Sequence, residues 1–100
     1  MVPDGQTNQL LGYPADARLL IINADDFGMC HAVNRAIFGV LKDGIVRSTT
    51  LMVPCPWMLH AIHFLTDHPE IPFGVHLTAI SEWADYRWGP VTAREKVPSL

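Results

Sequence analysis

Three short apolar runs alternate with two amphipathic segments, and this order constrains the fold more than any other feature of the sequence. The apolar runs are residues 18–23 (RLLIIN), 45–53 (IVRSTTLMV) and 71–80 (IPFGVHLTAI). Residues 31–44 and 56–69 lie between them and carry apolar side chains at helical spacing. A strand-helix-strand-helix-strand order is typical of parallel strands joined by crossover helices. We therefore expect an α/β fold with a parallel sheet, in which residues 18–23 form a strand buried on both faces.

The two ends of the chain lack this pattern. Residues 1–17 are polar and contain glycine and proline, so we interpret them as a flexible leader before a single domain at residues 18–100. Residues 81–100 are aromatic and charged without clear periodicity, which is more typical of a loop over a site than of a core element. A chain of 100 residues with 49% hydrophobic residues can form one modest core.

Composition excludes several classes of function. The formal net charge is −3 and the basic residues are scattered, which argues against a nucleic-acid-binding surface. The run LLII at residues 19–22 is far too short to span a membrane, and the start of the chain lacks the pattern of a secretory signal. The two cysteines, Cys30 and Cys55, form no CxxC motif, so we expect reduced thiols in a cytoplasmic protein.

Polar side chains follow each predicted strand. Asp25 and Asp26 follow the first strand, residues 48–50 (STT) belong to the second, and His76 belongs to the third. Ligands of parallel α/β folds bind at the carboxyl ends of the strands, so we expect these groups to converge. Carboxylate oxygens and imidazole nitrogens can hold Zn²⁺ or a similar divalent metal ion, which would acidify a bound water. The other carboxylate could then accept the proton.

Each of these residues also has an ordinary structural interpretation. An Asp-Asp pair after a strand often forms a turn and helix cap, and a single histidine in an apolar strand is more often a core residue. The histidines on or next to the predicted helices are interpreted as surface or capping residues: His31, His60, His63 and His68. The aromatic residues after the third strand could be core or substrate-binding side chains: Trp83, Tyr86 and Trp88.

Five motifs in order resemble the YdjC-like carbohydrate deacetylases, which include the chitooligosaccharide and hopanoid-biosynthesis deacetylase types. The motifs are NADDFG, VNRAI, KDGIVRSTT, GVHLT and SEWxxYRWGPV, and together they cover roughly residues 18–91. The resemblance implies a metal-dependent hydrolase that removes acetyl groups from N-acetylated sugars. It also implies that the predicted sheet is the N-terminal part of a TIM-barrel-like scaffold.

The resemblance also implies roles for individual residues. Asp26 and His76 would hold the metal ion, Mg²⁺ or Zn²⁺, and Asp25 would be the general base. Trp83, Tyr86 and Trp88 would stack on sugar rings, and Arg87 would hydrogen-bond to sugar hydroxyls or balance the acidic site.

The sequence departs from the family pattern in one respect. The family's second metal-binding histidine belongs to a downstream histidine-rich segment, which these 100 residues do not contain, and a complete barrel takes about 250 residues. We therefore expect little deacetylase activity and loose metal binding. We also expect self-association into a homo-oligomer through unpaired strand edges. One alternative is a non-catalytic α/β fragment that binds a metal ion or a partner. Another is a phosphoacceptor receiver domain, but that fold needs an aspartate where this chain has His76.

Overall fold

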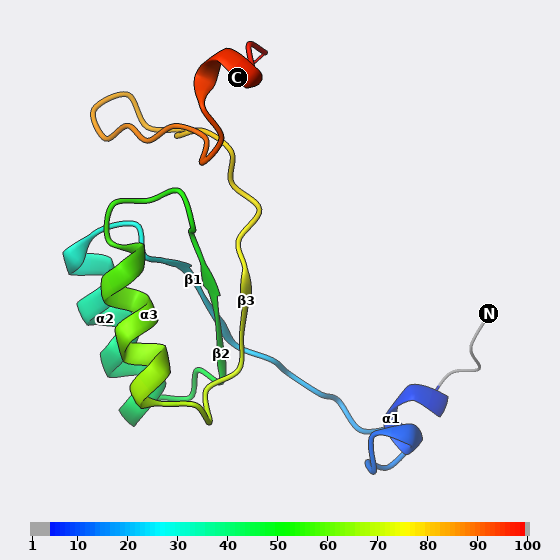
Figure 1. The fold of residues 1–100 in the computed structure, drawn as a ribbon. Helices are drawn as coiled ribbons and strands as arrows, with labels where there is room; N and C mark the ends of the chain where they lie inside the picture. Colours follow the sequence, from blue (N-terminus) through cyan, green and yellow to red (C-terminus); the bar gives the residue numbers. More distant parts are fainter. Residues whose placement is uncertain (1–4, 100) are drawn as a thin grey trace.

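The computed structural model describes residues 5–99, and it contains a three-stranded parallel sheet with strand order β1-β2-β3 (Figure 1). Two helices connect the strands, so the predicted parallel β-α-β-α-β unit is confirmed. The elements in chain order are α1 (Gln6–Leu10), β1 (Asn23–Phe27), α2 (His31–Asp43), β2 (Ser48–Leu51), α3 (Met58–Asp67), β3 (Phe73–Val75) and the 3₁₀ turn η1 (Arg94–Lys96).

Helices α2 and α3 lie side by side against one face of the sheet (Figure 1). Phe27 at the end of β1 is fully buried between this face and the helices, and its ring meets Phe38 and Phe64 edge-on at centroid distances of 5.6 and 6.0 Å. The rings of Phe38 and Phe64 stack on each other at 4.0 Å. Apolar side chains of the two helices and of β2 supply the rest of the core: Ile37, Leu41, Ala61 and Leu65 from the helices and Leu51 from β2.

The first strand lies further along the chain than the sequence predicts. Pairing with β2 begins at Asn23, opposite Ser48, and residues 18–22 lie outside the sheet. Leu20 and Ile21 are 81% and 80% exposed, so the prediction of a strand at residues 18–23 buried on both faces is wrong. The apolar composition indicates a preference for burial, but a strand forms only where a neighbour offers hydrogen-bonding partners.

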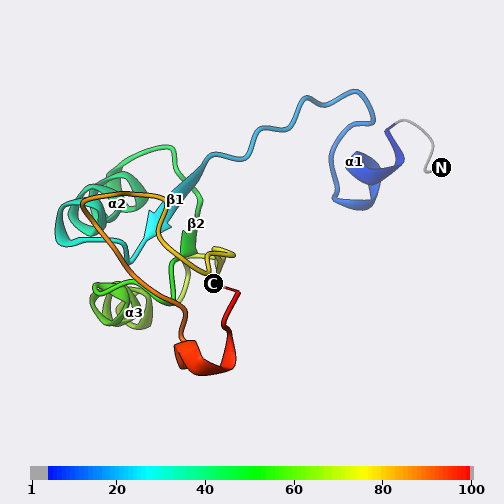
Figure 2. The same cartoon turned by 90° about the horizontal axis from the view of Figure 1, so that it is seen from above.

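The segments before β1 and after β3 extend away from the sheet (Figures 1 and 2). An extended stretch leads from α1, a five-residue helix within the range predicted as a flexible leader, to the start of β1. The radius of gyration is therefore 17.2 Å, larger than the ~13 Å of a compact chain of this length. After β3 the chain turns across the carboxyl end of the sheet (Figure 2). Among residues 5–99, no helix is long and apolar enough to cross a membrane.

Candidate metal centre

A β-bulge at the end of β1 shapes the site. Ala24 pairs with Thr49 and Phe27 pairs with Leu51, so β1 uses one residue more than β2 over the same stretch. Asp26 takes up the extra residue with a left-handed backbone (φ 65°), the only positive φ of a non-glycine residue among residues 5–99. Aspartate tolerates this conformation better than most residues.

The bulge decides which side chain enters the core. In a regular strand successive side chains point to opposite faces, so Asp26 would share the helix-covered face with Ala24. The extra residue gives that buried position to Phe27 instead, which is 0% exposed. Asp26 is left only partly buried and can turn toward the carboxyl end of the sheet.

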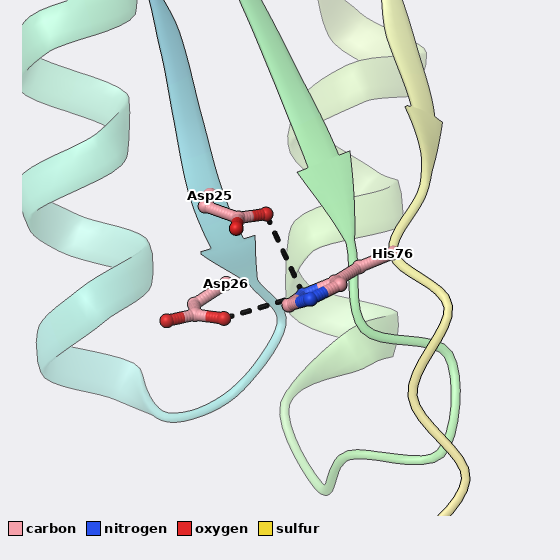
Figure 3. A group of neighbouring side chains, drawn as sticks. All are labelled: Asp25, Asp26 and His76. Atoms are coloured by element: carbon pink, nitrogen blue, oxygen red, sulfur yellow. Dashed lines mark ion pairs between the residues drawn. The ribbon is translucent and has the colours of Figure 1, made fainter.

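His76 follows β3 and completes a cluster with both carboxylates, hereafter the Asp–His cluster (Asp25, Asp26 and His76; Figure 3). Its backbone N–H donates to the carbonyl of Leu51 at 2.9 Å, which fixes it against the end of β2. Its Nδ1 lies 3.2 Å from Oδ1 of Asp26 and 3.5 Å from Oδ1 of Asp25 (Figure 3). One ligand atom from each residue lies within 4.8 Å of the others. The groups predicted to converge at the strand ends therefore do so.

Hydroxyl and amide groups of β1 and β2 orient Asp25. The hydroxyl of Thr50 donates to Oδ1 of Asp25 and accepts a hydrogen bond from Nδ2 of Asn23 at 3.3 Å. Ser48 in turn donates to Oδ1 of Asn23 at 2.7 Å. The hydroxyl of Thr49, on the other face, is buried and donates to the carbonyl of Ala24 instead. The hydrogen bond from Thr50 thus holds the carboxylate of Asp25 in place.

The chemistry of the Asp–His cluster fits a divalent cation. Nδ1 of His76 is buried, and no hydrogen bond satisfies it among the described residues even though two carboxylates lie close by. A buried polar atom without a partner is costly, and a cation shared with the carboxylates would satisfy it. Two carboxylate oxygens and one imidazole nitrogen also suit Zn²⁺ or Mg²⁺ better than an anion.

Comparison with known proteins places this chain in a family. The model of the family described as "YdjC-like protein" matches residues 19–100. The chain belongs to the YdjC-like family.

The YdjC-like chain is similar to several carbohydrate deacetylases. It is 44% identical over 59 residues to a chitooligosaccharide deacetylase of Yersinia enterocolitica, which covers 59% of this chain and 23% of the relative. It is 35% identical over 83 residues to a carbohydrate deacetylase of Thermoanaerobacter pseudethanolicus, which covers 83% of this chain and 31% of the relative. The chain thus spans less than a third of the length of these relatives.

A solved structure shares the fold. It is a protein of Enterococcus faecalis V583 whose proposed role is cellobiose-phosphate cleavage, with a TM-score of 0.67 and 40% sequence identity. The match covers 79% of this chain and 29% of that one. The YdjC-like fold described above is therefore shared with a crystal structure at substantial sequence identity.

The pKa values of two further side chains of the YdjC-like chain are raised by burial and by nearby charges. Burial raises the pKa of the Cys55 thiol to about 11, and the negative charge of Asp26 contributes to the rise. Burial also raises the pKa of Tyr86, with smaller contributions from Cys30 and Cys55. Both cysteines are free, as expected from their spacing. The charge of Asp26 therefore affects the pKa of a thiol outside the Asp–His cluster, that of Cys55.

The predicted substrate-binding residues lie on the segment that follows β3. The hydroxyl of Tyr86 donates to the carbonyl of Met29 at 2.6 Å, which ties this segment to the loop after β1. Arg87 and Trp88 line a hollow of about 330 Å³, while Trp83 is 52% exposed. A second hollow of about 340 Å³ is lined by His76, and Val91 lines both. The two hollows are neighbours, but Trp83, Arg87 and Trp88 form no hydrogen bond or ion pair with the Asp–His cluster in the described part of the chain.

Sequence reasoning missed two residues that support the site. Asn34 is fully buried in α2 and hydrogen-bonds to Gly28, to Trp57 and to His60. The interpretation of His60 as a surface or capping residue is therefore wrong, because its ring packs between other side chains. A polar residue three positions before Ile37 on the apolar stripe of α2 was the available signal.

Proposed function

We propose that this chain is part of a metal-dependent carbohydrate deacetylase, a hydrolase of acetamide C–N bonds. The observation that carries the proposal is the Asp–His cluster at the carboxyl end of a parallel sheet, the edge where such folds bind ligands. The naming of several relatives as carbohydrate deacetylases supports the same reaction.

Each member of the Asp–His cluster has a proposed role. Asp26 and His76 hold the metal ion, Mg²⁺ or Zn²⁺, because their ligand atoms are the closest pair across the two strands. Such an ion, when bound, acts as a Lewis acid toward a carbonyl oxygen and makes water more acidic. Asp25 accepts a proton from the attacking water, and the hydrogen bond from Thr50 holds its carboxylate in one orientation for that task.

We propose an N-acetylated sugar or oligosaccharide as the substrate. Trp83, Tyr86 and Trp88 belong to the segment that follows β3, which crosses the carboxyl end of the sheet, and aromatic side chains can stack on sugar rings. Arg87 offers several donors to sugar hydroxyls from the hollow it shares with Trp88.

The wider architecture is also proposed. Three parallel strands in sequential order with helices on one face are compatible with the N-terminal part of a (β/α) barrel domain, at residues 18–100. The exposed side chains of β3, including Phe73 and Val75, favour self-association of the chain as it stands. Two free cysteines are compatible with a cytoplasmic protein.

Metal titration of the 100-residue chain tests the site. We expect calorimetry to detect binding of Zn²⁺ or Mg²⁺, and His76→Ala to abolish it. His63→Ala is the matched control, because His63 is an exposed histidine of α3 and has no place in the Asp–His cluster. Equal metal affinity of wild type and His76→Ala would overturn the metal centre.

The chemical role is tested by acetate release from an N-acetylglucosamine oligomer. We expect slow, metal-dependent release that Asp25→Asn removes while metal binding stays detectable, because asparagine leaves Asp26 and His76 in place and keeps the hydrogen bond from Thr50 but cannot accept the proton. Metal binding without any acetate release from the wild type would favour the alternative of a non-catalytic metal-binding fragment.

A further inference from the structure

Asn34 places an amide in the core between α2, α3 and the loop after β1. Its side chain is 0% exposed, although its neighbours on α2 at this depth are apolar. The side-chain oxygen accepts a hydrogen bond from the backbone N–H of Gly28 at 2.7 Å. The side-chain nitrogen lies 3.0 Å from the carbonyl of Trp57 and 3.0 Å from Nδ1 of His60. A fully buried amide is stable only when it is bonded in this way.

The partners fix the orientation of the amide and the tautomer of His60. The backbone N–H of Gly28 can only donate, so the oxygen of Asn34 must face it. The carbonyl of Trp57 can only accept, so the nitrogen faces α3. Nδ1 of His60 therefore accepts the second N–H of Asn34. The amide thus joins the loop after β1 to the start of α3, where Trp57 also donates directly to the carbonyl of Gly28 at 3.1 Å.

Gly28, which Asn34 binds, lies two residues after Asp26 in the chain. The turn from Asp26 to Met29 contains two residues with a positive φ, Asp26 at 65° and Gly28 at 99°. The turn is closed by the N–H of Met29, which donates to the carbonyl of Asp26 at 3.1 Å. A left-handed aspartate persists only when its surroundings hold it, and Asn34 provides the buried side-chain bond on the Gly28 side.

We infer that Asn34 is a positioning residue for the Asp–His cluster. By holding Gly28, it keeps Asp26 in the left-handed conformation that allows two neighbouring carboxylates to reach His76. Without that hold the β1 end relaxes toward a regular strand, and alternation moves Asp25 and Asp26 to opposite faces. The inference rests on the proposed function only for its metal-binding readout.

Backbone NMR tests the conformational claim on the full chain without any metal. We expect the chemical shifts of Asp26 to report a left-handed residue in the wild type and an extended one in Asn34→Ala. Leu65→Ala is the matched control, because it removes a buried apolar side chain of α3 that forms no hydrogen bond to the loop, so we expect it to lower stability and to leave the shifts of Asp26 unchanged. Left-handed shifts of Asp26 in folded Asn34→Ala would overturn the inference.

Asn34→Asp covers the case in which the alanine variant does not fold. Aspartate keeps an acceptor for the N–H of Gly28 and loses both donors to α3. We expect it to keep the left-handed shifts of Asp26, and their loss in a folded Asn34→Asp would contradict the assigned role of the oxygen.

Calorimetric titration with Zn²⁺ separates this inference from the proposed function. We expect Asn34→Ala to weaken binding about 10- to 100-fold, as is usual for residues that orient metal ligands, and Leu65→Ala to leave it unchanged. Equal weakening in both variants would reduce Asn34 to a general stabilising residue. No Zn²⁺ binding by the wild type would contradict the proposed function, while the NMR comparison would still decide the role of Asn34.

Discussion

The thiol of Cys55 should report the charge at Asp26. Its pKa is raised from 9.0 to about 11, first by burial and then by the Asp26 carboxylate. Two pKa units correspond to an about 100-fold smaller thiolate fraction near pH 8 than in the unfolded chain. Asp26→Asn removes the second cause and keeps the first, so we expect the pKa of Cys55 to fall part of the way toward 9.

The assay is the pH dependence of alkylation by iodoacetamide, with peptide mapping by mass spectrometry to separate Cys55 from Cys30. The midpoint of the profile, rather than the absolute rate, gives the pKa, because burial also slows access. Saturating Mg²⁺ should shift the midpoint in the same direction as Asp26→Asn, since a cation at the Asp–His cluster offsets the same charge. A midpoint at or below 9 in the folded wild type, or one that Asp26→Asn leaves unmoved, would refute the reasoning.

The same pKa shift implies a dependence of stability on pH. The folded chain holds the thiol proton of Cys55 more tightly than the unfolded chain does, so the associated stability is fully present below pH 9. It is lost as the pH rises from 9 through about 11, which urea unfolding at several pH values would detect. Cys55→Ser should flatten this part of the profile.

Three further predictions concern the loop after β1, the segment after β3 and the exposed apolar surface. Gly28→Ala should lower the free energy of unfolding by about 1–3 kcal/mol, because Gly28 has φ 99° and a Cβ there would lie 3.1 Å from the backbone of α3. Urea unfolding measures this change. Gly39→Ala is the control, and we expect it to raise the free energy of unfolding by about 0.5–1 kcal/mol, because position 39 is helical and open. Tyr86→Phe removes the hydroxyl that donates to Met29, so limited proteolysis should cut residues 81–93 faster; an unchanged cleavage rate would mean that this hydrogen bond does not hold the segment. Leu77→Lys replaces an apolar side chain that is 93% exposed with a charged one, so self-association should weaken. Sedimentation velocity should detect less self-association than in the wild type. Identical profiles would mean that Leu77 lies outside the contact between chains.

The order of elements could be predicted from the sequence because it depends on local patterns. The apolar stripe of residues 31–44 indicates α2, and the β-branched residues before Met52 indicate β2. The position of the first strand could not be predicted in this way, because Leu20 and Ile21 are as apolar as core residues. Their exposure depends on where β2 supplies a partner, and that information lies about 25 residues further along the chain.

The candidate site could be predicted only in part, for a similar reason. The convergence of Asp25, Asp26 and His76 follows from the rule that parallel strands end at one edge. The bulge and the bonds of Asn34 depend on contacts between separate elements, and no periodicity in the sequence indicates them. The sequence therefore names the groups that meet, whereas the structure explains why two neighbouring carboxylates can meet the same imidazole.

The bulge in β1 has a mechanical consequence. Asp25 and Asp26 share one rigid peptide plane, but the backbone torsions on either side of that plane set the direction of each carboxylate. The φ of 65° at Asp26 is therefore a torsion on which the spacing of the two acids depends. A change of this torsion would separate the carboxylates, whereas a movement of the whole sheet would carry both of them together.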